Sequence, residues 1–178
     1  MTDKNMVEVD GATLSVTEVV LVSHHHAKVK VSEDAWPNIH AARGVVDRIV
    51  RNNETVYGIN TGFGALVHER ISQDDLNQLQ VNLVRSHATA VGPAMSIPEV
   101  RAMMLIRLNS LCKGHSGVHP HAIDQLVTFL NEDIHPYVPR IGSLGASGDL
   151  APLSHLAMAL MGEGYLQNQD GEKISTKD

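Results

Sequence analysis

Apolar residues recur every three or four positions along most of the chain, which is the spacing of one face of an α-helix. The clearest run begins after Ser32, a candidate helix cap, and ends at Asn52 and Asn53. Its apolar positions are Ala35, Ile39, Ala42, Val46 and Ile49. Pro98 and Pro120 stand where the first turn of a helix tolerates proline, and apolar residues follow each at the same spacing. These patterns predict a mainly α-helical chain.

Two further segments predict helices. Leu76, Leu79, Leu83 and His87 fall on one stripe, and Ser72 with Asp75 resembles a capping box ahead of that stripe. Residues 149–164 are apolar almost all round, which is typical of a buried helix.

Short β elements are expected beside these helices. Residues 6–11 alternate between apolar and polar and end in Asp10-Gly11, which predicts a strand and a turn. A second strand is expected at residues 28–31, and a hairpin around Asp170-Gly171. Glycine and proline in residues 57–66 and 135–148 predict irregular loops. The expected fold class is mainly α, with a small β element near the N-terminus and irregular glycine-rich loops.

Composition narrows the functional classes. The chain has 178 residues and a net charge of −6, whereas nucleic-acid binding needs clustered Lys and Arg. No apolar run approaches the roughly 18 residues that span a bilayer. Cys112 is the only cysteine, which excludes a disulfide framework and suits a reducing compartment. We therefore expect a cytoplasmic protein of one domain, or part of a larger one, that binds neither nucleic acid nor membranes.

The histidine clusters do not predict a metal site. The three histidines at positions 24–26 are consecutive, so on a helix their side chains diverge by about 100° each. His115, His119 and His121 have closer to ligand spacing, but glycine and proline interrupt the helix that would align them. No cysteine partner or paired carboxylate lies nearby. A solvated surface is the simpler interpretation of residues 24–26, and a zinc site at the second group is not expected.

Residues 142–155, GSLGASGDLAPLSH, form the stretch most suggestive of chemistry. A phosphate-binding loop would need Gly-Lys-Ser/Thr, and a nucleophile elbow would need Gly-x-Ser-x-Gly; neither pattern is present. Composition alone favours Ser147 or Asp149 as a helix cap. Ala146-Ser147-Gly148 also permits another chemistry, in which the Gly148 nitrogen attacks the Ala146 carbonyl and Ser147 loses water. Two non-catalytic alternatives stay open, an anion-binding loop and a helical interaction domain.

Three blocks resemble the histidine and aromatic amino-acid ammonia-lyase and aminomutase superfamily. They are residues 57–66 (YGINTGFGAL), residues 79–92 (LQVNLVRSHATAVG) and residues 142–164, which begin with GSLGASGDLAPLSH. The resemblance implies the N-terminal domain of the ammonia-lyase fold. It also implies that Ala146, Ser147 and Gly148 cyclise into 4-methylidene-imidazol-5-one (MIO), an electrophile built from the chain itself, with no metal or dissociable cofactor.

The same resemblance assigns roles to single residues. Tyr57 matches the tyrosine that serves as catalytic base, and Gly64 matches a glycine that lines the substrate site. Ser86 and His87 match the selectivity pair, and we expect Asp149 to orient the cyclising backbone. The Ser-His pair is similar to that of histidine ammonia-lyases, which form trans-urocanate and ammonia. Aromatic 2,3-aminomutases and tyrosine or phenylalanine ammonia-lyases are the alternatives.

The resemblance also sets expectations for the extent and partners of the chain. Members of the family continue for several hundred residues, so residues 1–178 are expected to be the N-terminal part of the MIO domain without the C-terminal helical bundle. Such a part alone is expected to have little or no lyase activity. The implied partners are an amino-acid substrate and further copies in a homotetramer. Ala90 stands where many relatives have glycine.

Overall fold

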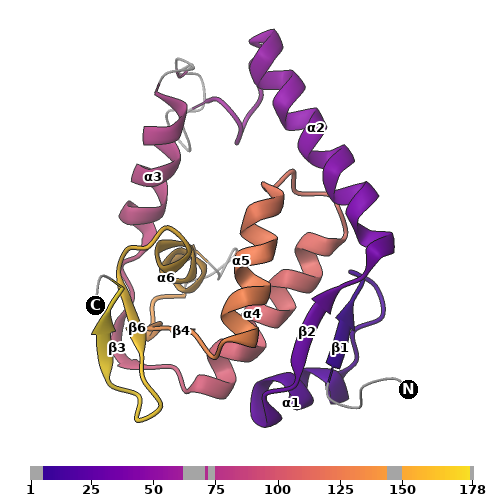
Figure 1. Ribbon diagram of the computed structural model, residues 1–178. Helices are drawn as coiled ribbons and strands as arrows, with labels where there is room; N and C mark the ends of the chain where they lie inside the picture. The colour runs from indigo at the N-terminus through magenta and orange to yellow at the C-terminus, as the bar shows by residue number, and fades with distance from the viewer. Residues whose placement is uncertain (1–5, 62–70, 72–74, 144–149, 177–178) are drawn as a thin grey trace.

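The N-terminal part of the chain forms a β-α-β unit at one side of the molecule (Figure 1). The computed structural model describes residues 6–61, 71, 75–143 and 150–176. Strand β1 (Met6–Val9) pairs in parallel with β2 (Lys28–Val31), and α1 (Val16–His25) connects them. Ser15 and Glu18 form a reciprocal capping box at the start of α1. Both predicted strands are confirmed.

The core forms around α4 (Ile97–Cys112), against which α1 and α5 (Pro120–Asn131) pack. Apolar α4 side chains that follow Pro98 at helical spacing, such as Met104 and Leu108, are fully buried. They meet fully buried side chains of the neighbouring elements: Val9, Val22, Val29, Ile123 and Leu126. Helix α2 (Trp36–Asn52) ends where its pattern predicts, and Asn53 follows in the left-handed conformation. The predicted cap at Ser32 is wrong: Ser32 precedes a short 3-10 turn, η1 (Glu33–Ala35), makes no side-chain capping bond, and α2 begins only at Trp36.

Helices α3 (Leu76–His87) and α6 (Leu150–Leu160) pack together on the opposite side of α4 and α5 from α1 and α2 (Figure 1). The predicted cap Ser72 lies outside the described residues; α3 begins at Leu76, with Asp75 at its N-cap position and no side-chain capping bond. The prediction of a buried α6 needs correction. Helix α6 is only partly buried: Ala151, Leu156 and Ala159 are covered, but Leu150 is 57% exposed.

The β content extends beyond the N-terminus. Strand β3 (Val91–Ala94) pairs antiparallel with β5 (Pro139–Ile141). Strand β6 (Tyr165–Gln167) lies between β4 (His135–Pro136) and β7 (Lys173–Ser175), which confirms the predicted hairpin. The prediction of an irregular loop is wrong for parts of residues 135–141, because β4 and β5 lie there. Prolines lack a backbone donor, so these short strands show no strand pattern in the sequence. The fold class remains mainly α. Within the described residues, no helix is both long and apolar enough to cross a membrane.

Candidate active site

The structure describes part of the predicted site. Tyr57 lies in the turn after α2, whereas Ser86 and His87 end α3. The predicted residues Gly64, Ala146, Ser147, Gly148 and Asp149 lie outside the described residues. Helix α6 begins at Leu150, two residues after the Ala-Ser-Gly triad.

The turn that carries Tyr57 is braced by a buried asparagine. Asn60 Oδ1 accepts a hydrogen bond from the Val56 backbone N–H at 2.9 Å, and Asn60 Nδ2 donates to the Glu54 carbonyl at 2.6 Å. Tyr57 itself is 61% exposed. Its neighbours Gly58 and Ile59 line a hollow with the first turns of α3. The turn that carries Tyr57 therefore lies near the beginning of α3, whereas His87 is the last residue of that helix.

Ser86 and His87 share one carbonyl acceptor on α3. The Leu83 carbonyl oxygen accepts from Ser86 Oγ at 2.9 Å and from His87 Nδ1 at 2.8 Å. Since a carbonyl can only accept, the proton of a neutral His87 ring lies on Nδ1. The other ring nitrogen, Nε2, is then a hydrogen-bond acceptor. His87 can therefore accept a hydrogen bond from a ligand through Nε2.

The chain around Ser86 and His87 is tied to both sides of residues 144–149. Before that segment, β5 pairs with β3, with Val91 opposite Ile141. After that segment, His155 on α6 accepts a hydrogen bond from the Ala90 backbone N–H at 3.2 Å. Arg85 adds a bidentate ion pair to Glu163, with bonds of 2.8 and 2.5 Å. The structure thus brings the SHATAVG block and the segments flanking the triad together.

Gly142 lies close to Ala90 of the SHATAVG block. A Cβ atom at Gly142 would lie 2.5 Å from Ala90 Cβ and 2.8 Å from Ala90 Cα. Real Cβ atoms essentially never approach other atoms so closely. The close backbone approach therefore favours glycine at position 142.

We expect Gly142→Ala to lower the free energy of unfolding by about 1–3 kcal/mol, because the added methyl group overpacks this contact. Ala90→Gly in the same chain should restore part of the loss, since it removes the nearest atom. Urea denaturation of the two variants and the unmodified chain measures the effect. Unchanged stability in Gly142→Ala would show that the contact is not tight.

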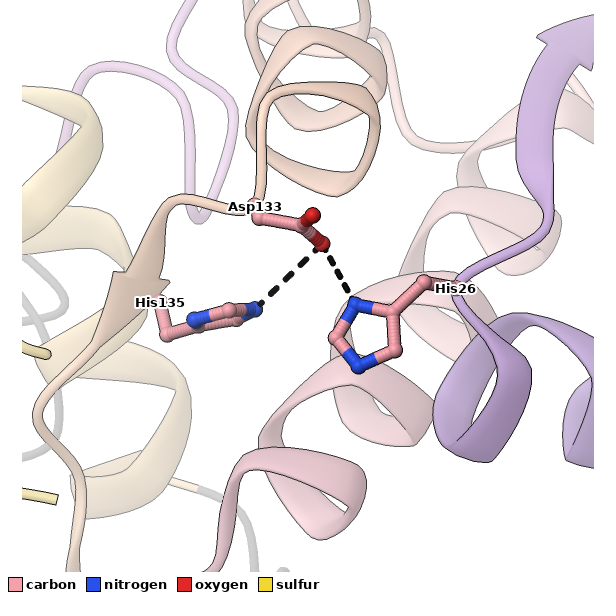
Figure 2. Close-up of side chains that lie close together, drawn as sticks. All are labelled: His26, Asp133 and His135. Atoms are coloured by element: carbon pink, nitrogen blue, oxygen red, sulfur yellow. Dashed lines mark hydrogen bonds and ion pairs between the residues drawn. The ribbon is translucent and has the colours of Figure 1, made fainter. Parts of the chain in front are cut away.

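A second cluster of polar side chains consists of His26, Asp133 and His135 (Figure 2). Their ligand atoms lie within 4.8 Å of one another, which is compatible with metal binding. Asp133 Oδ1 is 2.6 Å from His26 Nδ1 and 3.9 Å from His135 Nε2. The three residues follow α1, follow α5 and begin β4, so their sequence spacing gave no signal of this cluster.

A buried arginine already supplies the cation for this cluster. Arg101 Nη1 donates to Asp133 Oδ1 at 2.7 Å and lies 3.4 Å from His135 Nε2. Burial, followed by the Arg101 charge, lowers the pKa of His135 to about 4, so this ring is neutral at neutral pH. A metal ion here would meet the guanidinium charge at close range. The cluster is therefore best explained as a polar network that joins α1, α4 and α5.

Comparison with known proteins defines the class of the chain. The family model described as aromatic amino acid lyase matches residues 14–178, and the chain belongs to this family. The histidine ammonia-lyase of Staphylococcus aureus (strain bovine RF122 / ET3-1) is 49% identical over 166 residues, covering 93% of this chain and 33% of that protein. This chain therefore spans about a third of the length of such relatives.

Solved structures agree with this assignment. The tyrosine aminomutase from Streptomyces globisporus superposes with a TM-score of 0.89 at 40% identity, over 96% of this chain and 32% of that chain. The histidine ammonia-lyase from Trypanosoma cruzi gives a TM-score of 0.86 at 37% identity, over 97% of this chain and 33% of that chain. The resemblance found in the sequence is confirmed at the level of family and fold.

Proposed function

We propose that this chain supplies the Ala-Ser-Gly triad and the selectivity pair of an ammonia-lyase that converts histidine into trans-urocanate and ammonia. The observation that carries this proposal is the 49% identity to a histidine ammonia-lyase over 93% of the chain. The Ser86-His87 pair at the end of α3 agrees with it. Because the chain spans a third of that relative, the proposal concerns the enzyme to which these residues contribute.

The residue types at 146–148 are those that a self-formed MIO ring needs, and both neighbouring segments are anchored in secondary structure. The segment before residue 142 is held by the pairing of β3 with β5, and the segment from Leu150 onward forms α6. Gly142 brings the entering strand close to Ala90 and Ala151. The ring would supply an electrophile for the substrate amine. The backbone N–H groups at the start of α6 would favour negative charge near residues 146–149. Asp149 would orient the backbone that cyclises.

The remaining site residues would bind substrate and move a proton. We propose that His87 Nε2 accepts the imidazole N–H of histidine, because Nδ1 donates to Leu83. Ser86 supports this ring through the same carbonyl. Tyr57, exposed on its braced turn, would remove the substrate β-proton, and Gly64 would leave room for the substrate. Tyr57 lies at the other end of α3 from His87, so this assignment requires Tyr57 to reach the substrate from a separate wall of the site.

The test is a hybrid enzyme, in which residues 1–178 replace the matching third of the Staphylococcus aureus histidine ammonia-lyase. We expect the hybrid to produce urocanate from histidine, measured by ultraviolet absorbance. The 178-residue chain alone should produce little or none. A hybrid that folds and assembles but forms no urocanate from histidine would overturn the proposal.

His87→Leu in the hybrid should lower kcat/KM for histidine by about 100-fold, because the imidazole N–H of the substrate then has no acceptor. The loss for phenylalanine should be much smaller, since its ring has no polar hydrogen to satisfy. Steady-state assays with both amino acids measure the difference. Ser86→Ala is the matched control and should change kcat/KM by less than about tenfold. Equal losses for both substrates would contradict the assigned role of His87.

An aromatic 2,3-aminomutase is the second candidate, favoured by the similarity to the tyrosine aminomutase. Both enzymes would use the same residues and differ in the product. A mutase re-adds ammonia to give a β-amino acid, whereas a lyase releases the unsaturated acid. Chromatography of the products from histidine and tyrosine separates the two candidates.

A further inference from the structure

One histidine joins the turn after α3 to α6. Three backbone N–H groups follow His87, and each has an acceptor. Those of Ala88 and Thr89 donate to Val84 and His87 carbonyls at 3.1 and 2.8 Å, within the end of α3 itself. The third, that of Ala90, donates to His155 Nε2 at 3.2 Å, across 65 residues of sequence. This hydrogen bond therefore fixes the end of α3 relative to another helix.

The contacts of Ser86 and His87 cannot do this. Both side chains bond to Leu83 on their own helix, so they move with α3. A second polar link between this end of α3 and the α6 side is the Arg85–Glu163 pair, in which the Arg85 side chain is 50% exposed. Exposed pairs of this kind stabilise by less than about 1 kcal/mol. The half-buried His155 is better placed to hold the helix.

His155 is suited to accept this hydrogen bond. A backbone N–H only donates, so Nε2 must carry no proton, which requires a neutral ring protonated on Nδ1. Burial, followed by the charge of Lys173, lowers the pKa of His155 below its ordinary value. The ring is therefore neutral at neutral pH and can accept. A glutamine places an amide oxygen near the same position, whereas a leucine offers no acceptor.

We infer that His155 is a positioning residue for substrate selectivity, which holds Ser86 and His87 in place against α6 through the Ala90 backbone. This inference rests on the proposed function, because Ser86 and His87 matter for selectivity only in a lyase or mutase. The position of the helix end itself does not depend on that function. Only two residues separate His87 from Ala90, so a shift of Ala90 moves the His87 ring directly.

The first experiment uses the 178-residue chain and measures hydrogen exchange of the Ala90 amide by NMR. His155→Leu should speed this exchange by about tenfold or more, because the N–H loses its acceptor. His155→Gln should restore protection. Ser154→Ala is the matched control, since Ser154 Oγ bonds to the Leu150 carbonyl within α6. Unchanged Ala90 exchange in His155→Leu would overturn the inference.

The second experiment uses the hybrid enzyme. His155→Leu should raise KM for histidine by about tenfold while kcat changes by less than about threefold, because binding geometry is lost and the electrophile is kept. His155→Gln should return KM to within about threefold. A fall in kcat of about tenfold with unchanged KM would contradict a positioning role. A KM that glutamine does not restore would contradict it as well. If the unmodified hybrid forms no product, the proposed function is wrong, and so is the role of His155 in substrate selectivity. The exchange rate of the Ala90 amide still decides whether His155 holds the end of α3.

Discussion

Ser147→Ala should lower the lyase activity of the hybrid enzyme by at least about a thousandfold, because alanine has no hydroxyl to lose and cannot give the electrophilic methylene. Substrate binding should change far less, since the proposed contact of the amino-acid side chain is with His87. Single-turnover measurements with histidine, together with competition by a non-reacting analogue, separate the two effects.

The matched control for this prediction is Ser143→Ala. Ser143 lies four residues before Ser147 and is exposed, and it has no part in the proposed ring. Its replacement should leave activity within about twofold. A Ser147→Ala hybrid that retains a tenth or more of the activity would show that the hydroxyl of Ser147 is not the source of the electrophile.

Arg101→Leu should lower the free energy of unfolding by about 2–5 kcal/mol, because two buried carbonyl oxygens lose their donor. Arg101 is fully buried. Its Nε donates to the Val22 carbonyl at 2.8 Å, and its Nη1 donates to the Leu130 carbonyl at 3.1 Å and to Asp133. Leucine would leave these acceptors without their donor. Denaturant unfolding followed by circular dichroism measures the loss.

Arg107→Leu is the control for this prediction, because Arg107 lies on the same helix but is exposed. Its stability should stay within about 0.5 kcal/mol of the unmodified chain. Within the described residues, Arg101 Nη2 has no hydrogen-bond partner, and removing this atom offsets part of the cost. An Arg101→Leu chain as stable as Arg107→Leu would show that the network around Asp133 contributes nothing to folding.

The helices could be predicted from the sequence because their apolar spacing is local information. Ile39, Met104 and Ile123 lie on the predicted faces and are buried. The pairing of β3 with β5 could not be predicted, since proline lies within β3 and begins β5, and the partners lie over forty residues apart. The partial exposure of α6 was also missed, because an all-apolar pattern does not say which face a neighbour covers.

Only the part of the candidate site that lies in sequence motifs could be predicted. The three blocks identified the family, but they gave no role to His155, because its hydrogen bond joins two residues that are 65 positions apart in the sequence. The sequence around Arg101 gives a weak indication that this residue is buried: Met104, Leu105 and Leu108, on the same helical face, are all apolar. An arginine on an apolar face is a candidate for a buried polar network.

The mass of residues 141–173 tests the central claim most directly. Trypsin cleaves after Arg140 and Lys173 and releases this segment with the Ala-Ser-Gly triad inside it. From the assembled hybrid enzyme, we expect a peptide lighter by about 36 Da, the loss of two water molecules on ring formation. The Ser147→Ala peptide should lack this loss. An unmodified mass for the Ser147 peptide, in a hybrid that releases ammonia from histidine, would contradict the account.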